Sequence, residues 1–275
     1  MKTIIVPIDF SKYSENALKV AAKIAKKQSA EIVVVHMMGL TEANLVTENN
    51  SMEGMFYIKL TKKRFEEFLD KDYLKDVTIH QTVKNYKVFS ELDDVAKEHD
   101  ASLIVMGSHG SSGIQEVFVG SNTEKVVRTA TVPVLVIKEE SDFAASKAIF
   151  ACDFRHESLD VFNKAIRFFD TLEIQTTLLY INPPGENYRS DSQIEKRIED
   201  FNVDLNVDNK ILPEDVIIYN DFSVEAGVFN FAKKVNADII GIPTHGRRGL
   251  AHFFSGSISE DIVNHSELPV LTFKM

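Results

Sequence analysis

Glycine and hydroxyl residues with a spacing suited to holding an anion follow one apolar run of the chain. After residues 102–106, SLIVM, come Gly107-Ser-His-Gly110, nine further residues, and then Gly120-Ser121. Glycines let a backbone approach a bulky anion, and the first amides of a helix point toward negative charge. The spacing alone leaves two interpretations open, phosphate binding or glycines that only form turns and caps. The common phosphate signatures, GxxxxGK followed by Ser or Thr and GxGxxG after a strand, are absent from the sequence.

Two aspartates, Asp9 and Asp153, each end a short apolar run and precede a phenylalanine. Such a carboxylate can assist a metal, but it can equally fix a loop or hydrogen-bond a base. His109 and His245 occupy matching positions near the glycines, where a phosphate contact and a purely backbone role are both open. A zinc site needs at least three converging ligands, and neither HExxH nor Cys-x2-Cys spacing occurs.

The chain contains two copies of one sequence unit. Four segments of the first half resemble four of the second in the same order: TIIVPIDF and KAIFACDF at 3–10 and 147–154, DASLIVMGSHG and NADIIGIPTHG at 100–110 and 236–246, VGSNTEK and SGSISED at 119–125 and 255–261, TVPVLVI and ELPVLTF at 131–137 and 267–273. Repeats of this kind indicate two domains of the same fold. We expect domains at 1–140 and 146–275, separated by a polar stretch near 139–146.

Apolar runs and helical periodicity alternate within each copy. In the first copy we predict strands at 3–8, 32–37, 77–83, 102–106 and 132–137, helices after Ser11 or Ser14 and at 58–71, 89–99 and 121–130, and a polar loop at 41–54. Continuous apolar strands between helices favour a parallel sheet covered on both faces. Ligands of such sheets bind outside the carboxyl ends of the strands.

Composition and charge restrict the function classes. The chain has 275 residues, 44% hydrophobic and 26% charged, which is typical of a folded protein. Its net charge of −10 weighs against binding to duplex DNA. The single cysteine, Cys152, lies in an apolar run and predicts an inert core thiol in a reducing compartment. Since no secretory segment and no run of about 20 apolar residues is visible, we expect a cytoplasmic protein that binds neither nucleic acid nor membrane.

The complete motif set resembles the universal stress protein family. The pattern Gly-x2-Gly-x9-Gly followed by Ser or Thr is met by Gly107, Gly110, Gly120 and Ser121, between an opening Val-Pro-Ile-Asp-Phe-Ser and a closing Val-Pro-Val-Leu-Val-Ile. Two copies make the chain resemble a tandem-type member. The resemblance implies an α/β fold, two similar domains that are each a five-stranded parallel sheet sandwiched by helices, of the Rossmann-like type found in adenine nucleotide alpha hydrolases. One branch of the family binds ATP through this pattern.

The resemblance also implies a set of ATP-binding residues in the first copy. The adenine and ribose would contact Pro7, Ile8, Asp9 and Met37. The ribose and phosphates would be lined by Met106, Gly107, His109 and Gly110. The phosphates would be held by Gly120, Ser121, Asn122 and Thr123. Mg²⁺ could accompany the nucleotide.

The second copy departs from the pattern. Pro243 replaces the first glycine and has no N–H to offer a phosphate. Phe253 and Phe254 lie between the remaining glycines, while Asp153 and Ser257 are retained. We expect a degenerate pocket kept for structure, with a different, smaller ligand as the open alternative.

The expected function is that of an ATP-binding, nucleotide-responsive stress or signalling protein with one working site in the first domain. The alternatives are an interaction scaffold that binds no nucleotide and a slow ATPase. Hydrolysis needs a positioned water and charge stabilisation at the γ-phosphate, and no P-loop lysine supplies the latter. Prolines begin the last strands at 132–137 and 268–273, which suits edges. We therefore expect the two copies to pair as an intramolecular pseudo-dimer, with a homodimer and an unknown protein partner as further possibilities.

Overall fold

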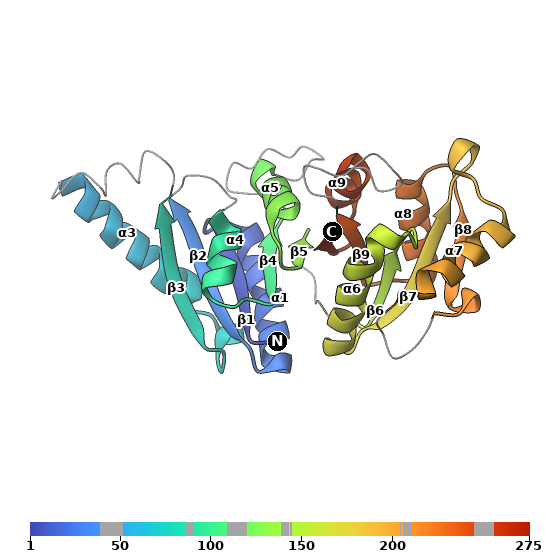
Figure 1. The fold of residues 1–275 in the computed structure, drawn as a ribbon. Coiled ribbons are helices and arrows are strands. Elements are labelled where there is room, and N and C mark those ends of the chain that lie inside the picture. Colours follow the sequence, from blue (N-terminus) through green and yellow to red (C-terminus); the bar gives the residue numbers. More distant parts are fainter. Residues whose placement is uncertain are drawn as a thin grey trace. The chain divides into compact units, whose positions relative to one another are not determined.

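The computed structural model describes residues 1–38, 52–85, 91–108, 120–138, 143, 145–203, 205, 211–244 and 256–275. The chain forms two compact units, with most of residues 1–142 in the first and most of residues 143–275 in the second. Strands and helices alternate along the chain in both units (Figure 1). Among the described residues, no helix combines the length and the apolar character that crossing a membrane requires.

The first unit is built on a five-stranded parallel sheet. Its elements are β1 (Thr3–Ile8), α1 (Lys12–Gln28), β2 (Glu31–Met38), α3 (Met52–Leu69), β3 (Ile79–Asn85), α4 (Glu91–Glu98), β4 (Leu103–Gly107), α5 (Ser121–Thr129) and β5 (Val134–Ile137). The strand order is β3-β2-β1-β4-β5. Because all four pairings are parallel, the carboxyl ends of β1, β2 and β4 lie at one edge of the sheet.

Helix α1 begins after Ser11, one of the two caps that the sequence predicts. Ser11 is the N-cap, and its hydroxyl accepts a hydrogen bond from the Ser14 amide at 3.3 Å. The helix ends at Ser29, whose φ of 51° is left-handed. The apolar positions of α1 recur with a period near 3.6 and are all buried, comprising Ala17, Val20, Ala21, Ile24 and Ala25. This face packs on β1 and β4.

Helix α3 differs from its prediction. It begins at Met52, six residues before the expected start at 58, and it includes the last three residues of the stretch 41–54 that we expected to be a loop; residues 39–51 lie outside the described residues. The buried positions of α3 are Gly54, Thr61, Phe65 and Phe68, while Met52 and Phe56 are exposed. The first turns therefore lack the apolar periodicity that marks a packed helix.

The second unit repeats this plan. Its elements are β6 (Lys147–Ala151), α6 (Leu159–Thr171), β7 (Gln175–Asn182), α7 (Asp191–Val203), β8 (Val216–Asn220), α8 (Val224–Val235), β9 (Ile239–Thr244), α9 (Gly256–His265) and β10 (Val270–Lys274). The strand order is β10-β9-β6-β7-β8, all parallel, so that β6 corresponds to β1. Its core is aromatic, with Phe150 in edge contact with Phe162, Phe169 and Phe273.

Candidate functional site

The first unit gathers many of the predicted site residues at the carboxyl edge of its sheet. β1 and β4 are hydrogen-bonded neighbours with Ile4 opposite Leu103, so Asp9 follows β1 at the level where β4 ends at Gly107. Met37 is the residue before last in the neighbouring strand β2. The remaining strand residues line the same region, Ile8 and Met106 being buried and Pro7 half-buried. His109 and Gly110 lie outside the described residues.

Gly107 is required by packing against α1. A Cβ built on Gly107 would lie 2.8 Å from the carbonyl oxygen of Tyr13 and 2.9 Å from its carbonyl carbon. These atoms belong to the helix backbone and cannot rotate away. Gly107 therefore lets the first turn of α1 approach β4, which is a structural reason for a glycine that sequence alone associated with an anion.

Hydrogen bonds join the end of β4 to the start of α5. The Gly120 amide donates to the Ser108 carbonyl at 2.8 Å, and the Thr123 hydroxyl donates to the Gly107 carbonyl at 3.0 Å. Ser108 is fully buried and Thr123 is 3% exposed. The Thr123 hydroxyl, which we expected at a phosphate, is thus hydrogen-bonded within the domain. This bond holds the start of α5 beside the end of β4.

The amino terminus of α5 offers backbone donors at this edge. The helix begins at Ser121, and the amides of Thr123 and Glu124 already bond to the Gly120 carbonyl. The amides of Ser121 and Asn122 occupy the first helical positions, which have no intrahelical acceptor. Asn122 is exposed. Amides at a helix start, reinforced by the helix dipole, favour an anion.

An aromatic cluster that the sequence analysis missed lies beside Asp9. Phe10 has a left-handed φ of 64°, and its ring packs 4.7 Å from His36 and edge-on to Phe65. The His36 Nδ1 is 3.0 Å from the Ile8 carbonyl oxygen, while the Ser11 amide donates to the Asp9 carboxylate at 3.0 Å. This cluster fixes the turn that carries Asp9. The only sequence signal for it was the repeated Asp-Phe pair.

In the second unit the corresponding aspartate is held by its own loop. Asp153 is 5% exposed, and its carboxylate accepts hydrogen bonds from the Ser158 hydroxyl at 2.7 Å and the Arg155 amide at 3.2 Å. The Arg155 guanidinium is also 3.4 Å from this carboxylate. Phe154 repeats the left-handed backbone of Phe10 with φ of 49°. The fold itself thus engages the Asp153 carboxylate through a hydroxyl, an amide and a guanidinium.

The strand-to-helix bond of the first unit recurs at Pro243. The Ser259 hydroxyl donates to the Pro243 carbonyl at 3.0 Å, and Ser259 is 2% exposed. Thr123 and Ser259 thus perform the same task in the two copies. His245, Phe253 and Phe254 lie outside the described residues.

Cys152 is buried, as predicted. It directly follows β6 and is 2% exposed. Burial raises the pKa of its thiol, and the nearby Asp153 carboxylate raises that pKa further. Since the thiolate is the reactive form of cysteine, this side chain is inert at neutral pH.

A parallel sheet with a helix start and an aspartate at its carboxyl edge is the architecture of an α/β ligand-binding domain. The model of the universal stress protein family matches the chain twice, at residues 1–138 and 145–274. The chain therefore belongs to the universal stress protein family, and its two matches make it a tandem-type member.

Individual relatives agree with this assignment. The chain is 31% identical over 147 residues to universal stress protein MJ0531 of Methanocaldococcus jannaschii, covering 50% of this chain and 82% of that protein. It is 20% identical to universal stress protein Slr1230 of Synechocystis over an alignment that spans both proteins completely. The crystal structure of a universal stress protein from Archaeoglobus fulgidus has the same fold, with a TM-score of 0.66 and 20% identity over 99% of this chain and 96% of that one.

Proposed function

We propose that the first domain, residues 1–140, binds ATP at the carboxyl edge of its sheet and that the chain acts as a nucleotide-responsive stress or signalling protein. The observation that carries this proposal is the start of α5, held beside the end of β4 at the same edge as Asp9. One group of donors and one acceptor thus face the same region, as the phosphates and the ribose of a nucleotide would require.

Each described residue has a role in this proposal. The amides of Ser121 and Asn122 would hold phosphate oxygens, because the first amides of a helix have no partner in the helix. The Asp9 carboxylate would accept hydrogen bonds from ribose hydroxyls, and Met37 would contact the base. His109 and Gly110 complete the proposed set.

The second domain, residues 146–275, has a different role in this proposal. Its Asp153 is bonded to Ser158 and Arg155, and Pro243 replaces the first glycine. We infer one working ATP site per chain. Bound ATP can change what partners encounter only through different affinities for two states of the protein.

The proposal is tested by calorimetric titration of ATP into protein freed of co-purified nucleotide. We expect saturable binding at one site per chain, lost in Gly120→Val, whose bulky side chain stands where the phosphates would approach, and weakened in Asp9→Asn. Glu31→Gln is the matched control for Asp9→Asn. It removes one carboxylate from the opposite edge of the same sheet, where Glu31 forms an exposed pair with His80.

An interaction scaffold is the second candidate. The first turns of α3 expose Met52 at 83% and Phe56 at 68%, a surface suited to a protein partner. If nucleotide-free protein failed to bind ATP up to millimolar concentration, the nucleotide function would be excluded and this candidate would replace it. Turnover of ATP that persists through purification and falls in Asp9→Ala would instead indicate an ATPase.

A further inference from the structure

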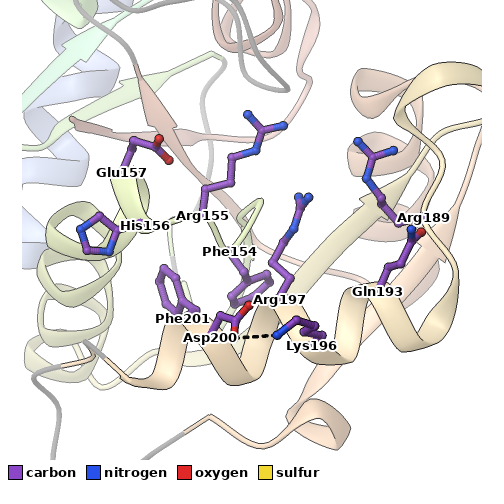
Figure 2. Close-up of a pocket in the computed structure, with 10 residues that line it drawn as sticks. All are labelled: Phe154, Arg155, His156, Glu157, Arg189, Gln193, Lys196, Arg197, Asp200 and Phe201. Carbon is purple, nitrogen blue, oxygen red and sulfur yellow. Dashed lines mark hydrogen bonds and ion pairs between the residues drawn. The ribbon is translucent and has the colours of Figure 1, made fainter.

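The second unit contains a cavity of about 630 Å³ between the segment that follows β6 and helix α7. Residues 154–157 form one wall, and residues 189–201 form the other (Figure 2). The proposed ATP site of the first unit contributes nothing to it. Its volume lies within the range of roughly 300–1,000 Å³ that is typical of small-molecule sites.

Arginines dominate the cavity. Arg155, Arg189 and Arg197 are half-buried, and their guanidinium groups point to the same side, over a floor that contains Phe154 and Phe201 (Figure 2). Residues 141–275 carry a net charge of −8 and six arginines, three of which line this one cavity. Arginines spread over the acidic surface of this unit would neutralise more of its negative charge. Their concentration in one cavity therefore needs another explanation.

Backbone carbonyls rather than carboxylates orient two of these arginines. The Arg189 guanidinium donates to the carbonyls of Glu186 at 2.9 Å and Tyr188 at 2.7 Å, and that of Arg197 donates to the Asp153 carbonyl at 3.5 Å. Among the residues that the structure describes, no carboxylate forms an ion pair with either of them. They are held in place without being neutralised.

The remaining charges leave the cavity positive. Arg155 is paired with Asp153, and Lys196 lies 3.3 Å from Asp200. Counting the side chains that line the cavity together with Asp153, the partner of Arg155, the positive charges exceed the negative ones by one with His156 neutral. An excess positive charge beside an apolar floor attracts an anion more strongly than it would in open water.

The floor is aromatic and buried. Phe154 is 1% exposed and Phe201 is 3% exposed, and their rings meet edge-on at 5.6 Å. The left-handed backbone of Phe154 directs the next residue, Arg155, to the cavity. The first copy has Ser11 at the position of Arg155, where it caps α1. The cationic side chain is therefore specific to the second copy.

We propose that this cavity binds the phosphoryl group of a small phosphorylated molecule. Guanidinium groups match phosphate oxygens through paired hydrogen bonds. Arg189 and Arg197 line the cavity, and each has N–H groups beyond those that donate to backbone carbonyls. The volume exceeds that of phosphate alone, so the rest of the molecule lies over the phenylalanine floor. The site is independent of the proposed ATP site, because it uses neither the glycine pattern nor the first unit.

The test is titration of the full-length chain with pyrophosphate, inorganic phosphate or malonate at constant ionic strength. Binding is monitored by calorimetry and, for the phosphorus compounds, by ³¹P NMR. Gly120→Val serves as the background so that binding at the glycine pattern cannot contribute. We expect saturable binding of pyrophosphate, weaker binding of phosphate, and at least tenfold weaker binding of malonate.

Substitutions inside and outside the cavity distinguish binding in the cavity from a general effect of positive charge. Arg197→Gln and Arg189→Gln should each weaken pyrophosphate binding about tenfold or more, and Arg197→Lys should recover only part, since lysine keeps the charge but loses the fork. Arg167→Gln, at an exposed position of α6, removes the same charge elsewhere in the unit and should leave the affinity for pyrophosphate unchanged. Arg155 is left intact because it is paired with Asp153.

Circular dichroism and thermal unfolding establish that each variant is folded. The proposal is overturned if pyrophosphate shows no saturable binding up to millimolar concentration, if Arg167→Gln weakens binding as much as Arg197→Gln, or if malonate binds as tightly as pyrophosphate. None of these results depends on whether the first domain binds ATP.

Discussion

Substituting alanine for Gly107 separates the two reasons why a glycine can end β4. One reason is room for a bound anion, and the other is the approach of α1. Gly107 lies in a strand with an ordinary extended backbone, so alanine causes no conformational strain there. The added Cβ would stand 2.8 Å from the Tyr13 carbonyl oxygen, and helix α1 would have to retreat by about half an ångström to restore normal contact.

The expected cost follows from what must move. Overpacking of a well-packed core destabilises by about 1–3 kcal/mol. The obstacle at Gly107 is helix backbone, which favours the upper part of that range. Gly227 in α8 is the matched control, because the Cβ of an alanine there would meet the Ile181 side chain at 2.7 Å. The Ile181 side chain is β-branched and buried, so it can yield only in part. Alanine adds about 1 kcal/mol of helix propensity, so Gly227→Ala should cost less than Gly107→Ala.

Hydrogen exchange followed by mass spectrometry is the assay, since two units need not unfold together and the method reports on each element separately. In nucleotide-free Gly107→Ala, peptides from α1 and β4 should exchange about five- to a hundredfold faster, while peptides of the second unit stay unchanged. Unaltered protection of α1 and β4 would refute the packing argument. If Gly107→Ala kept this protection but no longer bound ATP, Gly107 would be needed for the ligand and not for packing.

Three further results are expected. The Cys152 thiol, whose pKa is raised by burial, should resist an aromatic disulfide reagent at pH 8 until the protein is denatured; rapid reaction of folded protein would contradict its burial. Burial alone raises the pKa of Asp238, but hydrogen bonds from two amides and the Ser146 hydroxyl outweigh burial and lower this pKa. Asp238→Asn should therefore cost about 0.5–1.5 kcal/mol at pH 7, since solvent screens these exposed hydrogen bonds. In urea titrations the difference from wild type should shrink as the pH falls below about 4; a pH-independent difference would exclude the charge as its cause. Thr123→Val should cost about 1–3 kcal/mol because it leaves the buried Gly107 carbonyl without its hydroxyl donor, and a urea midpoint equal to that of wild type would show that this bond contributes nothing.

The inner strands of the sheet could be predicted from sequence because they are buried on both faces. A strand of that kind is a continuous apolar run, so the prediction for 3–8 matches β1 and the prediction for 32–37 differs from β2 by one residue at each end. Helix α1 was equally accessible, since its cap and its apolar face are both local signals. The start of α3 could not be predicted, because Met52 and Phe56 are exposed and produce no periodicity.

The position of the proposed site residues could be predicted in part. Glycine spacing and the repeated aspartates predicted residues at the ends of strands, and Asp9 and Gly107 lie there; that they bind a ligand stays a prediction. The approach of Tyr13 to Gly107 is a contact between distant residues, and no pattern around either one encodes it. The same holds for the arginine cavity. Arg155, Arg189 and Arg197 become neighbours only through the fold, and the one local hint was Arg155 at the position of Ser11.

Comparison of the two copies distinguishes residues that hold the edge from residues that can change its ligand. Both copies keep a left-handed phenylalanine after the first strand, and both use a buried hydroxyl, Thr123 or Ser259, to bond the carbonyl at the end of the fourth strand. The carbonyl of a proline accepts that bond as well as the carbonyl of a glycine does, so the Pro243 replacement removes an amide donor and keeps the bond to the helix. Once the edge no longer depends on that amide, the second copy can place an arginine beside its aspartate and acquire affinity for an anion on the α7 side. The same backbone thus supports two different charge arrangements, and for this reason ligand binding must be measured separately in each domain.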